Sequence, residues 1–400
     1  MRIIDGGVTA PQGFKASGAA CGLKKNGKKD VAVVCSDNLA KAAGVFTTNV
    51  VKGHSLKLSM EHIKCGLAKA VVINSGNANA CVGKQGDDDA LLMASIASEK
   101  LGCDVKNVLV GSTGVIGIPL NMDALKNGIT MAVESLSYDG GHSAEEAIMT
   151  TDLVPKEIAV EIEIDGKPVK IGGMAKGSGM IHPNMATMIG IITTDVNISN
   201  ELLDKALKEN IKKTFNRVSV DGDTSVCDKV LIFANALSGI DEIVKEDSRY
   251  EAFKSALAHV CTYLSRLIAK DGEGATKLIE INVDGAKTED DAYKIAVAVA
   301  KSPLVKTAIF GEDANWGRIL TAAGYSGASF DPDKVDVYIG DLLVCKSGTG
   351  LSFDEEKASE ILKNKEVTIF IKLNDGNFSD RMWTCDFSYD YVKINGSYRS

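Results

Sequence analysis

The alternation of apolar and polar residues along the chain predicts a dense succession of short strands and amphipathic helices. Apolar runs bounded by turn residues predict strands at Asp30–Cys35 and Lys69–Asn74. Two alternating runs, EIAVEIEI and KPVKI, flank Asp165-Gly166 and predict a hairpin with a type I′ turn. Apolar residues recurring at helical spacing predict helices over about Asp87–Leu101 and Tyr250–Lys270.

The second half of the chain repeats this pattern. Ser199 suits the N-cap of another amphipathic helix. Beyond residue 276 the pattern predicts strands and helices in alternation, at Lys277–Val283, Glu289–Ala300, Val305–Phe310, Asn315–Ala323, Val335–Cys345, Phe353–Lys363 and Glu366–Leu373. The chain is therefore expected to be an α/β protein. Periodicity alone does not choose between a layered sandwich and a parallel doubly wound sheet.

The chain is organised around the stretch KGSGMIHPNMATMIGIITTD, from Lys176 to Asp195. Small residues lead to the apolar run Met185–Ile192, which predicts a buried strand. A threonine near the start of such a strand usually serves packing. The alternative is that the chain cuts its own Ala186–Thr187 bond, because Thr187 would then carry a hydroxyl nucleophile and a free α-amine to activate it.

Motifs along nearly the whole chain favour the second interpretation. They are VTAPQGF at 8–14, AAGVFTTNVVKG at 42–53, VINSGNANAC at 72–81, GSTGVIG at 111–117, IMTTD at 148–152, AKDGEGATK at 269–277, DANWGRILTAAGYSG at 313–327 and SYDYVKINGSYRS at 388–400. With the stretch around Thr187, these motifs resemble the ornithine acetyltransferase (glutamate N-acetyltransferase) family of arginine biosynthesis.

The resemblance implies a fold, a processing step and an activity. The fold would be an αββα sandwich of two face-to-face sheets, with a smaller α/β domain within about 275–400. Self-cleavage would give fragments 1–186 and 187–400, and two cleaved protomers would assemble as α2β2. The enzyme would move acetyl from N2-acetylornithine to L-glutamate through an acetyl-Thr187 intermediate, without a cofactor. The sequence leaves open whether acetyl-CoA also serves as a donor.

The resemblance also assigns residues. Thr113 and Gly114 match the oxyanion-hole positions. The substrate-binding positions are Thr150, Lys176, Thr187, Glu273, Asn395 and Ser400. A lysine suits an α-carboxylate and a glutamate suits an ornithine ammonium. The family commonly ends in threonine, whereas this chain ends in Ser400, which keeps the hydroxyl and loses the methyl group.

Composition narrows the partners and the compartment. Of 400 residues, 45% are hydrophobic and 24% charged, as in globular proteins, and the net charge of −8 argues against nucleic acid and anionic membranes. The chain shows no apolar run long enough to span a membrane and no signal region at its start. Nine cysteines without a CxxC pair suggest reduced thiols and hence the cytoplasm. The five histidines form no zinc motif, and Asp221 and Asp223 are expected to form a turn rather than a metal site.

Two other classes of enzyme share features of this sequence. Gly111, Gly114 and Gly117 form GxxGxxG, and GEGATK lacks the P-loop pattern, so a nucleotide-binding enzyme is disfavoured. An N-terminal-nucleophile amidase or aminopeptidase would use the same Thr187 chemistry but give the acyl group to water. His182, close by in sequence, is expected to be a loop residue without catalytic duty.

Overall fold

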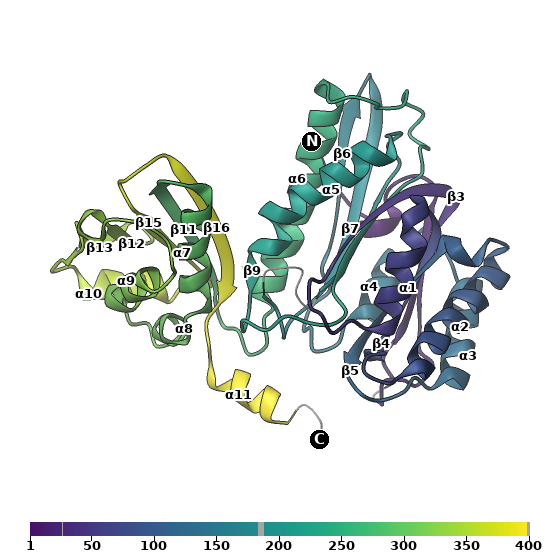
Figure 1. The fold of residues 1–400 in the computed structure, drawn as a ribbon, viewed down its shortest axis with the longest axis horizontal. Coiled ribbons are helices and arrows are strands. Elements are labelled where there is room, and N and C mark those ends of the chain that lie inside the picture. The colour runs from purple at the N-terminus through teal and green to yellow at the C-terminus, as the bar shows by residue number, and fades with distance from the viewer. Residues whose placement is uncertain (26, 183–187, 398–400) are drawn as a thin grey trace. The chain divides into compact units, whose positions relative to one another are not determined.

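The computed structural model describes residues 1–25, 27–182 and 188–397, which divide into two compact units (Figure 1). The first unit comprises residues 1–177, 184–216 and 223–264. The second comprises residues 178–183, 217–222 and 265–400. Each unit has a sheet of its own with helices beside it, so the expected α/β class is confirmed.

The sheet of the first unit has nine strands in the order β1-β6-β7-β8-β10-β3-β4-β5, with β2 paired to β3. Their bounds are β1 Arg2–Ile4, β2 Phe14–Ala19, β3 Val31–Phe46, β4 Leu67–Asn77, β5 Val108–Val115, β6 Glu157–Ile164, β7 Lys167–Lys176, β8 Ile189–Thr194 and β10 Lys229–Ala234. Strands β4 and β5 are parallel, as are β8 and β10, whereas β7 and β8 are antiparallel.

The long strand β3 folds this sheet into two layers. Its first half pairs with β4, its second half pairs with β10, and the register shifts between Cys35 and Ala40. Strands β10 and β5 are three places apart, which in a flat sheet is roughly 14 Å. Nevertheless, Lys229 Nζ on β10 donates to the carbonyl of Val110 on β5 at 3.0 Å. The two halves of the sheet therefore face one another, as the sandwich prediction expects.

Apolar side chains alternate between the two faces of each half. On β5, Leu109 joins a buried cluster that also contains residues of β7, β8, β10 and helix α4, whereas Val108 and Val110 pack with helices α2 and α3. On β7, the face at Gly173 lies against Val260 and Leu264 of α6. Helices α2, α3 and α6 thus cover the outer faces of the two layers, and α4 joins the buried cluster between them. The bounds of the helices in this unit are α1 His54–His62, α2 Lys84–Leu101, α3 Met122–Glu134, α4 Gly141–Ile148, α5 Asn200–Lys213 and α6 Ser248–Lys270.

The second unit is built on a seven-stranded mixed sheet in the order β14-β13-β12-β15-β11-β16-β9. Its strands are β9 Val218–Ser219, β11 Leu278–Ala286, β12 Asp336–Ile339, β13 Leu342–Lys346, β14 Thr349–Gly350, β15 Glu366–Lys372 and β16 Phe378–Cys385. Its helices are α7 Glu289–Lys301, α8 Pro303–Phe310, α9 Trp316–Gly324, α10 Glu355–Leu362 and α11 Tyr389–Gly396. Among the described residues, no helix is long and apolar enough to cross a membrane.

Most predicted elements are present, and two predictions in the second unit are wrong. Residues 305–310, predicted as a strand in the alternation, belong to helix α8, because Ser302 caps its N-terminus and Pro303 occupies its first turn. The run Val335–Cys345 forms two strands, β12 and β13, because Gly340 turns the chain at a φ of 59°. The hairpin of β6 and β7 is confirmed, with positive φ at both Asp165 and Gly166.

Candidate active site

Thr113 and Gly114 lie near the end of β5, directly beside the end of β4. Thr113 pairs with Ser75 and Gly114 with Gly76 in this parallel ladder. The Thr113 side chain is buried. A threonine hydroxyl can donate a hydrogen bond to a developing oxyanion, which is what an oxyanion-hole role requires.

Only glycine fits at position 114. Its φ is 129°, and a Cβ there would lie 2.3 Å from the main-chain carbon and oxygen of Gly76. The main chain of Gly76 thus occupies the space that a side chain at residue 114 would need. The position of the backbone N–H of residue 114 therefore depends on a local geometry that any larger residue would disrupt.

Thr150 and Lys176 are brought into direct contact. Lys176, the last residue of β7, donates from Nζ to the Thr150 hydroxyl at 2.7 Å. Asp152 organises this pair, because its carboxylate accepts the N–H of Thr150 (2.9 Å) and the N–H of Gly177 (2.6 Å) and lies 3.8 Å from Lys176 Nζ. The segments that carry Thr150 and Lys176, 26 residues apart in sequence, are thus fixed to one carboxylate.

Other ionisable side chains lie close to the buried carboxylate of Asp152. Lys156 donates from Nζ to Asp152 at 2.8 Å, and both side chains are fully buried. Burial by itself would raise the pKa of Asp152, but Lys176 and Lys156 hold it below its usual value. Burial raises the pKa of nearby Glu145 to about 8, against the opposing N–H of Lys156. Lys156 and Lys176 therefore both lie beside the Asp152 carboxylate, and an ammonium group there can attract an anionic group.

Glu273 and Asn395 form the corresponding pair of the second unit. Asn395, on α11, donates from Nδ2 to Glu273 Oε2 at 2.9 Å. The Glu273 N–H donates to the carbonyl of Ser178 at 3.0 Å, and Ser178 donates its hydroxyl to the carbonyl of Asp271. A Cβ on Gly179 would lie 2.3 Å from the Glu273 carboxyl group, so the chain at residue 179 passes directly beside this side chain.

Carboxylates hold the main chain on both sides of residues 183–187. In the second unit, Asp221 accepts the N–H groups of Met180 (2.6 Å) and Ile181 (3.0 Å). In the first unit, Asp228 Oδ1 accepts the N–H of Met188 at 3.0 Å. Ala186, Thr187 and Ser400 lie outside the described residues, so their assigned roles remain predictions.

His182, the histidine nearest to Thr187 in the sequence, lies beside Ser219. His182 Nδ1 lies 3.3 Å from Ser219 Oγ, and burial, with Lys301 adding to it, lowers the His182 pKa to about 4. The imidazole is therefore neutral near pH 7. Among the described residues, no group of three or more His, Cys, Asp or Glu side chains could hold a metal ion.

Comparison with known proteins assigns the chain to a family. The ArgJ family model matches residues 15–400. The chain belongs to the ArgJ family. The arginine biosynthesis bifunctional protein ArgJ of Caldanaerobacter subterraneus subsp. tengcongensis is 52% identical over the full length of both chains, and that of Symbiobacterium thermophilum is 53% identical, again over both full lengths. A crystal structure of the Bacillus halodurans protein of that name is 42% identical with a TM-score of 0.51, covering 97% of its own chain and 52% of this one.

Membership of the ArgJ family makes this chain an arginine biosynthesis enzyme, and the structure brings its predicted residues together in pairs. Thr113 adjoins Gly114, Thr150 contacts Lys176, and Glu273 contacts Asn395. The first two pairs belong to the first unit and the third to the second unit.

Sequence reasoning did not predict the main-chain contacts of three carboxylates, one of which, Asp221, was expected only to form a turn. Asp152, Asp221 and Asp228 each accept main-chain N–H groups beside a predicted site residue or beside residues 183–187. Asp152 stands within the IMTTD motif, and Asp228 directly precedes an apolar strand. A charged residue beside an otherwise apolar strand was the available signal, although a surface turn gives the same pattern.

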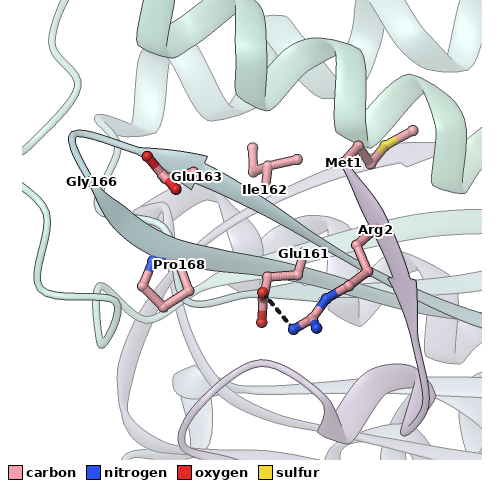
Figure 2. Close-up of a pocket in the computed structure, with 7 residues that line it drawn as sticks. All are labelled: Met1, Arg2, Glu161, Ile162, Glu163, Gly166 and Pro168. Atoms are coloured by element: carbon pink, nitrogen blue, oxygen red, sulfur yellow. Dashed lines mark hydrogen bonds and ion pairs between the residues drawn. The ribbon is translucent and has the colours of Figure 1, made fainter.

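A surface hollow of about 290 Å³ lies elsewhere, between β1 and the hairpin of β6 and β7 (Figure 2). Arg2 and Glu161 face one another across its rim at 2.8 Å. No residue predicted for the ArgJ site lines this hollow, and the Arg2 side chain is 70% exposed. The contact between Arg2 and Glu161 is therefore a solvated surface ion pair, and the hollow beside it lacks the character of a binding site.

Proposed function

We propose that this chain moves acetyl from N2-acetylornithine to L-glutamate through an acetyl-Thr187 intermediate, after cutting its own Ala186–Thr187 bond. The observation that carries the proposal is the pairing of residues assigned to substrate binding. Lys176 contacts Thr150 and Glu273 contacts Asn395, although each pair comes from separate stretches of the sequence. Lys176 supplies positive charge for an α-carboxylate, and Glu273 supplies negative charge for an ornithine ammonium.

Self-cleavage would begin with the Thr187 hydroxyl. Its Oγ attacks the Ala186 carbonyl carbon, the peptide C–N bond breaks, and the acyl group passes from nitrogen to oxygen as an ester. Water then hydrolyses this ester, releasing the Ala186 carboxylate and restoring the Thr187 hydroxyl. Thr187 becomes a new N-terminus whose α-amine has a reference pKa of about 7.7–8.0.

Transfer would use the same hydroxyl a second time. The neutral α-amine accepts the hydroxyl proton as Oγ attacks the acetyl carbonyl of N2-acetylornithine. The Thr113 hydroxyl and the Gly114 N–H donate to the oxyanion, the C–N bond breaks, and ornithine leaves with the proton. The amine of glutamate then attacks the acetyl ester, giving N-acetylglutamate and free Thr187.

A relative's solved chain supports the cleavage step. The Bacillus halodurans chain aligns over 97% of its own length but spans only 52% of this chain. A processed precursor would leave such a chain, because the fragment that begins at Thr187 is slightly more than half of the 400 residues.

The test is an assay of purified protein with N2-acetylornithine, with and without L-glutamate. The proposal expects N-acetylglutamate and ornithine in equal amounts, and parallel double-reciprocal lines, because the acetyl-enzyme separates the two half-reactions. Thr187→Ala should remain full-length and inactive, whereas Thr187→Ser should cleave and turn over more slowly. Ornithine release at the same rate without glutamate would establish a hydrolase instead. Intersecting lines would favour direct transfer in a ternary complex.

A second activity is proposed for this chain because of the name that its full-length relatives carry. They are called bifunctional, which suits an enzyme that also makes N-acetylglutamate from acetyl-CoA. Incubation of the protein with L-glutamate and acetyl-CoA, followed by measurement of free CoA, tests this directly. Absence of CoA release above that of the Thr187→Ala variant would leave the transferase as the chain's acetyl-transfer activity.

A further inference from the structure

The stretch that follows β2 brings a lysine, Lys24, close to the predicted site residues of the first unit. Three of its main-chain N–H groups donate to the fully buried carboxylate of Asp30, from Cys21 (2.8 Å), Leu23 (2.7 Å) and Lys24 (3.1 Å). The side chain of Lys24 is partly buried, and its Nζ donates to the carbonyl of Lys29 at 2.7 Å. The main chain and the side chain of Lys24 are therefore both held in place.

The main chain next to Lys24 lies against the end of β4. A Cβ on Gly76 would lie 3.4 Å from the carbonyl oxygen of Leu23, which is ordinary van der Waals contact. Gly76 pairs in turn with Gly114, whose lack of a Cβ leaves room for the Gly76 main chain. The end of β4 thus contacts both the predicted oxyanion-hole residues, Thr113 and Gly114, and the stretch that carries Lys24.

The carbonyl of Ala147 connects Lys24 with the other predicted pair. Lys24 Nζ lies 3.5 Å from this oxygen, which also accepts the hydroxyl of Ser75 at 2.5 Å. Ser75 is the β4 partner of Thr113. Ala147 lies in the last turn of α4, from which the chain continues directly to Thr150. Lys24 is therefore linked to both predicted pairs of the first unit.

Lys24 is a partly desolvated cation that lies near a second cation. Burial, together with the ammonium groups of Lys176 and Lys28, lowers the pKa of Lys24 to about 8, against the opposing carboxylates of Asp30 and Asp152. The Asp30 carboxylate already accepts three main-chain N–H groups. An anionic group of a ligand beside Lys24 and Lys176 would offset both the lost hydration and the repulsion between the two ammonium groups.

We propose that Lys24 is a further substrate-binding residue, which pairs with the α-carboxylate that N2-acetylornithine and L-glutamate have in common. This inference rests on the proposed acetyl transfer. Both substrates carry this carboxylate on the carbon atom bonded to the reacting nitrogen, so it must lie close to the oxyanion that Thr113 and Gly114 would stabilise. Lys24 lies near this pair and near Lys176, so one carboxylate would bind two ammonium groups.

A role in the fold alone makes a different prediction. A lysine near the last carbonyls of helix α4 also stabilises that helix, whatever ligand is bound. The analogue N-acetyl-1,4-diaminobutane, which is N2-acetylornithine without its carboxylate, separates the two roles. A residue that binds the carboxylate affects only the ligand that has one, whereas a residue that supports the fold affects both ligands.

The experiment measures steady-state kinetics of the wild-type protein, Lys24→Met, Lys24→Arg and the control Lys29→Met. Lys24→Met should raise KM for both N2-acetylornithine and L-glutamate roughly ten- to hundred-fold and leave kcat within about threefold of wild type. The inhibition constant of N-acetyl-1,4-diaminobutane, measured against N2-acetylornithine, should change by less than about threefold. Lys24→Arg keeps the positive charge and should restore most of the loss.

The control removes a lysine side chain from the same part of the chain. Lys29 pairs with Glu146 at 2.8 Å, and its side chain is 38% exposed. Lys29→Met keeps the carbonyl that accepts Lys24 Nζ, and loss of a surface ion pair should leave every constant within about threefold of wild type. Self-cleavage should proceed in all variants, because no substrate is bound in that step. If Lys24→Met does not fold or cleave, Lys24→Gln, which keeps an amide donor, takes its place.

Four outcomes would overturn the assignment. They are wild-type KM values in the uncharged variant, equal weakening of N2-acetylornithine and its analogue, a rise in KM confined to L-glutamate, and absence of cleavage in both uncharged variants. The second would leave Lys24 a role in the fold, and the third would assign it to the other carboxylate of glutamate. Absence of acetyl transfer in the wild-type protein would instead overturn the proposed function, and this inference with it.

Discussion

Several buried carboxyl groups of this protein hold main-chain amides rather than partner side chains alone. Asp152 accepts the N–H groups of Thr150 and Gly177, Asp195 those of Lys170 and Gln12, and Asp386 those of Thr276 and Lys277. A buried N–H without an acceptor is costly, so one carboxylate can fix two separate loops at once. At the predicted site, Asp152 in this way fixes Thr150 and the residue that follows Lys176.

Substitution of the single residue Thr113 tests its proposed role in the oxyanion hole. Thr113→Val replaces the hydroxyl by a methyl group of the same shape, so the fold should persist while one oxyanion donor is lost. We expect kcat for acetyl transfer to fall roughly 10²–10³-fold with little change in KM, and Thr113→Ser to retain most activity. Steady-state kinetics of both variants checks this. A change confined to KM would remove Thr113 from the oxyanion role.

Glu145 predicts a pH dependence of stability. Its folded pKa is raised to about 8 by burial, whereas an unfolded glutamate titrates near 4.3. The folded state therefore binds more protons between these values, and its free energy of unfolding falls as pH rises from about 5 to 8, by up to about 1.4 kcal/mol per pH unit. Glu145→Gln should flatten this decline in urea unfolding curves.

The adjacent residue supplies the control for this measurement. Glu146 is 43% exposed and pairs with Lys29, so Glu146→Gln changes the same charge at the surface. Its pH profile should keep the decline seen in the wild-type protein. A wild-type profile that is flat between pH 5 and 8 would contradict the raised pKa of Glu145.

At the scale of elements, the terminal helix α11 positions a predicted substrate residue. Gly274 has a φ of 70°, and a Cβ there would lie 2.4 Å from the Tyr391 main-chain nitrogen, so α11 packs closely on the loop that carries Glu273. Phe387 and Tyr391 stack at 4.7 Å between ring centroids. The helix is therefore held by its own packing at the end that precedes Asn395.

Truncation of the tail should separate the two proposed activities. Deletion of residues 396–400 leaves Asn395 and Glu273 in place, so cleavage at Thr187 should continue, while loss of Ser400 raises KM for both amino acids. Deletion from Asn395 onward also removes the amide donor to Glu273 and should raise KM further. Gel analysis and steady-state kinetics measure both effects. Wild-type kinetics in both truncations would show that the tail is only surface.

At the scale of the whole molecule, the proposed cleavage would not divide the first unit's sheet into separable parts. Strand β8 pairs with β7, and β10 pairs with β3, so strands from beyond Thr187 lie between strands from before it. The nine cysteines, all of which the structure describes, form no disulfide with one another. The fragments 1–186 and 187–400 should thus stay together through hydrogen bonds and packing.

A purification experiment tests this expectation. The two fragments should co-elute in size-exclusion chromatography under native conditions and separate in denaturant without any reducing agent. Retention of a single band in non-reducing denaturing gels, resolved only by a thiol, would reveal a disulfide link. Dissociation under native conditions would contradict the interleaved sheet.

The sequence alone determined the class of the protein and predicted which of its residues react. Strand and helix periods, the hairpin at Asp165-Gly166 and the motifs around Thr187 depend on local chemistry, which a linear pattern records. Short apolar runs such as 305–310 were misassigned because strand and buried helix share that pattern over so few residues. Tertiary structure decided the folding of one sheet into two layers, the pairing of Lys176 with Thr150, and the burial of Asp152 and Asp228. These depend on contacts between residues distant in sequence, where burial alone makes a carboxyl group a main-chain anchor rather than a surface charge.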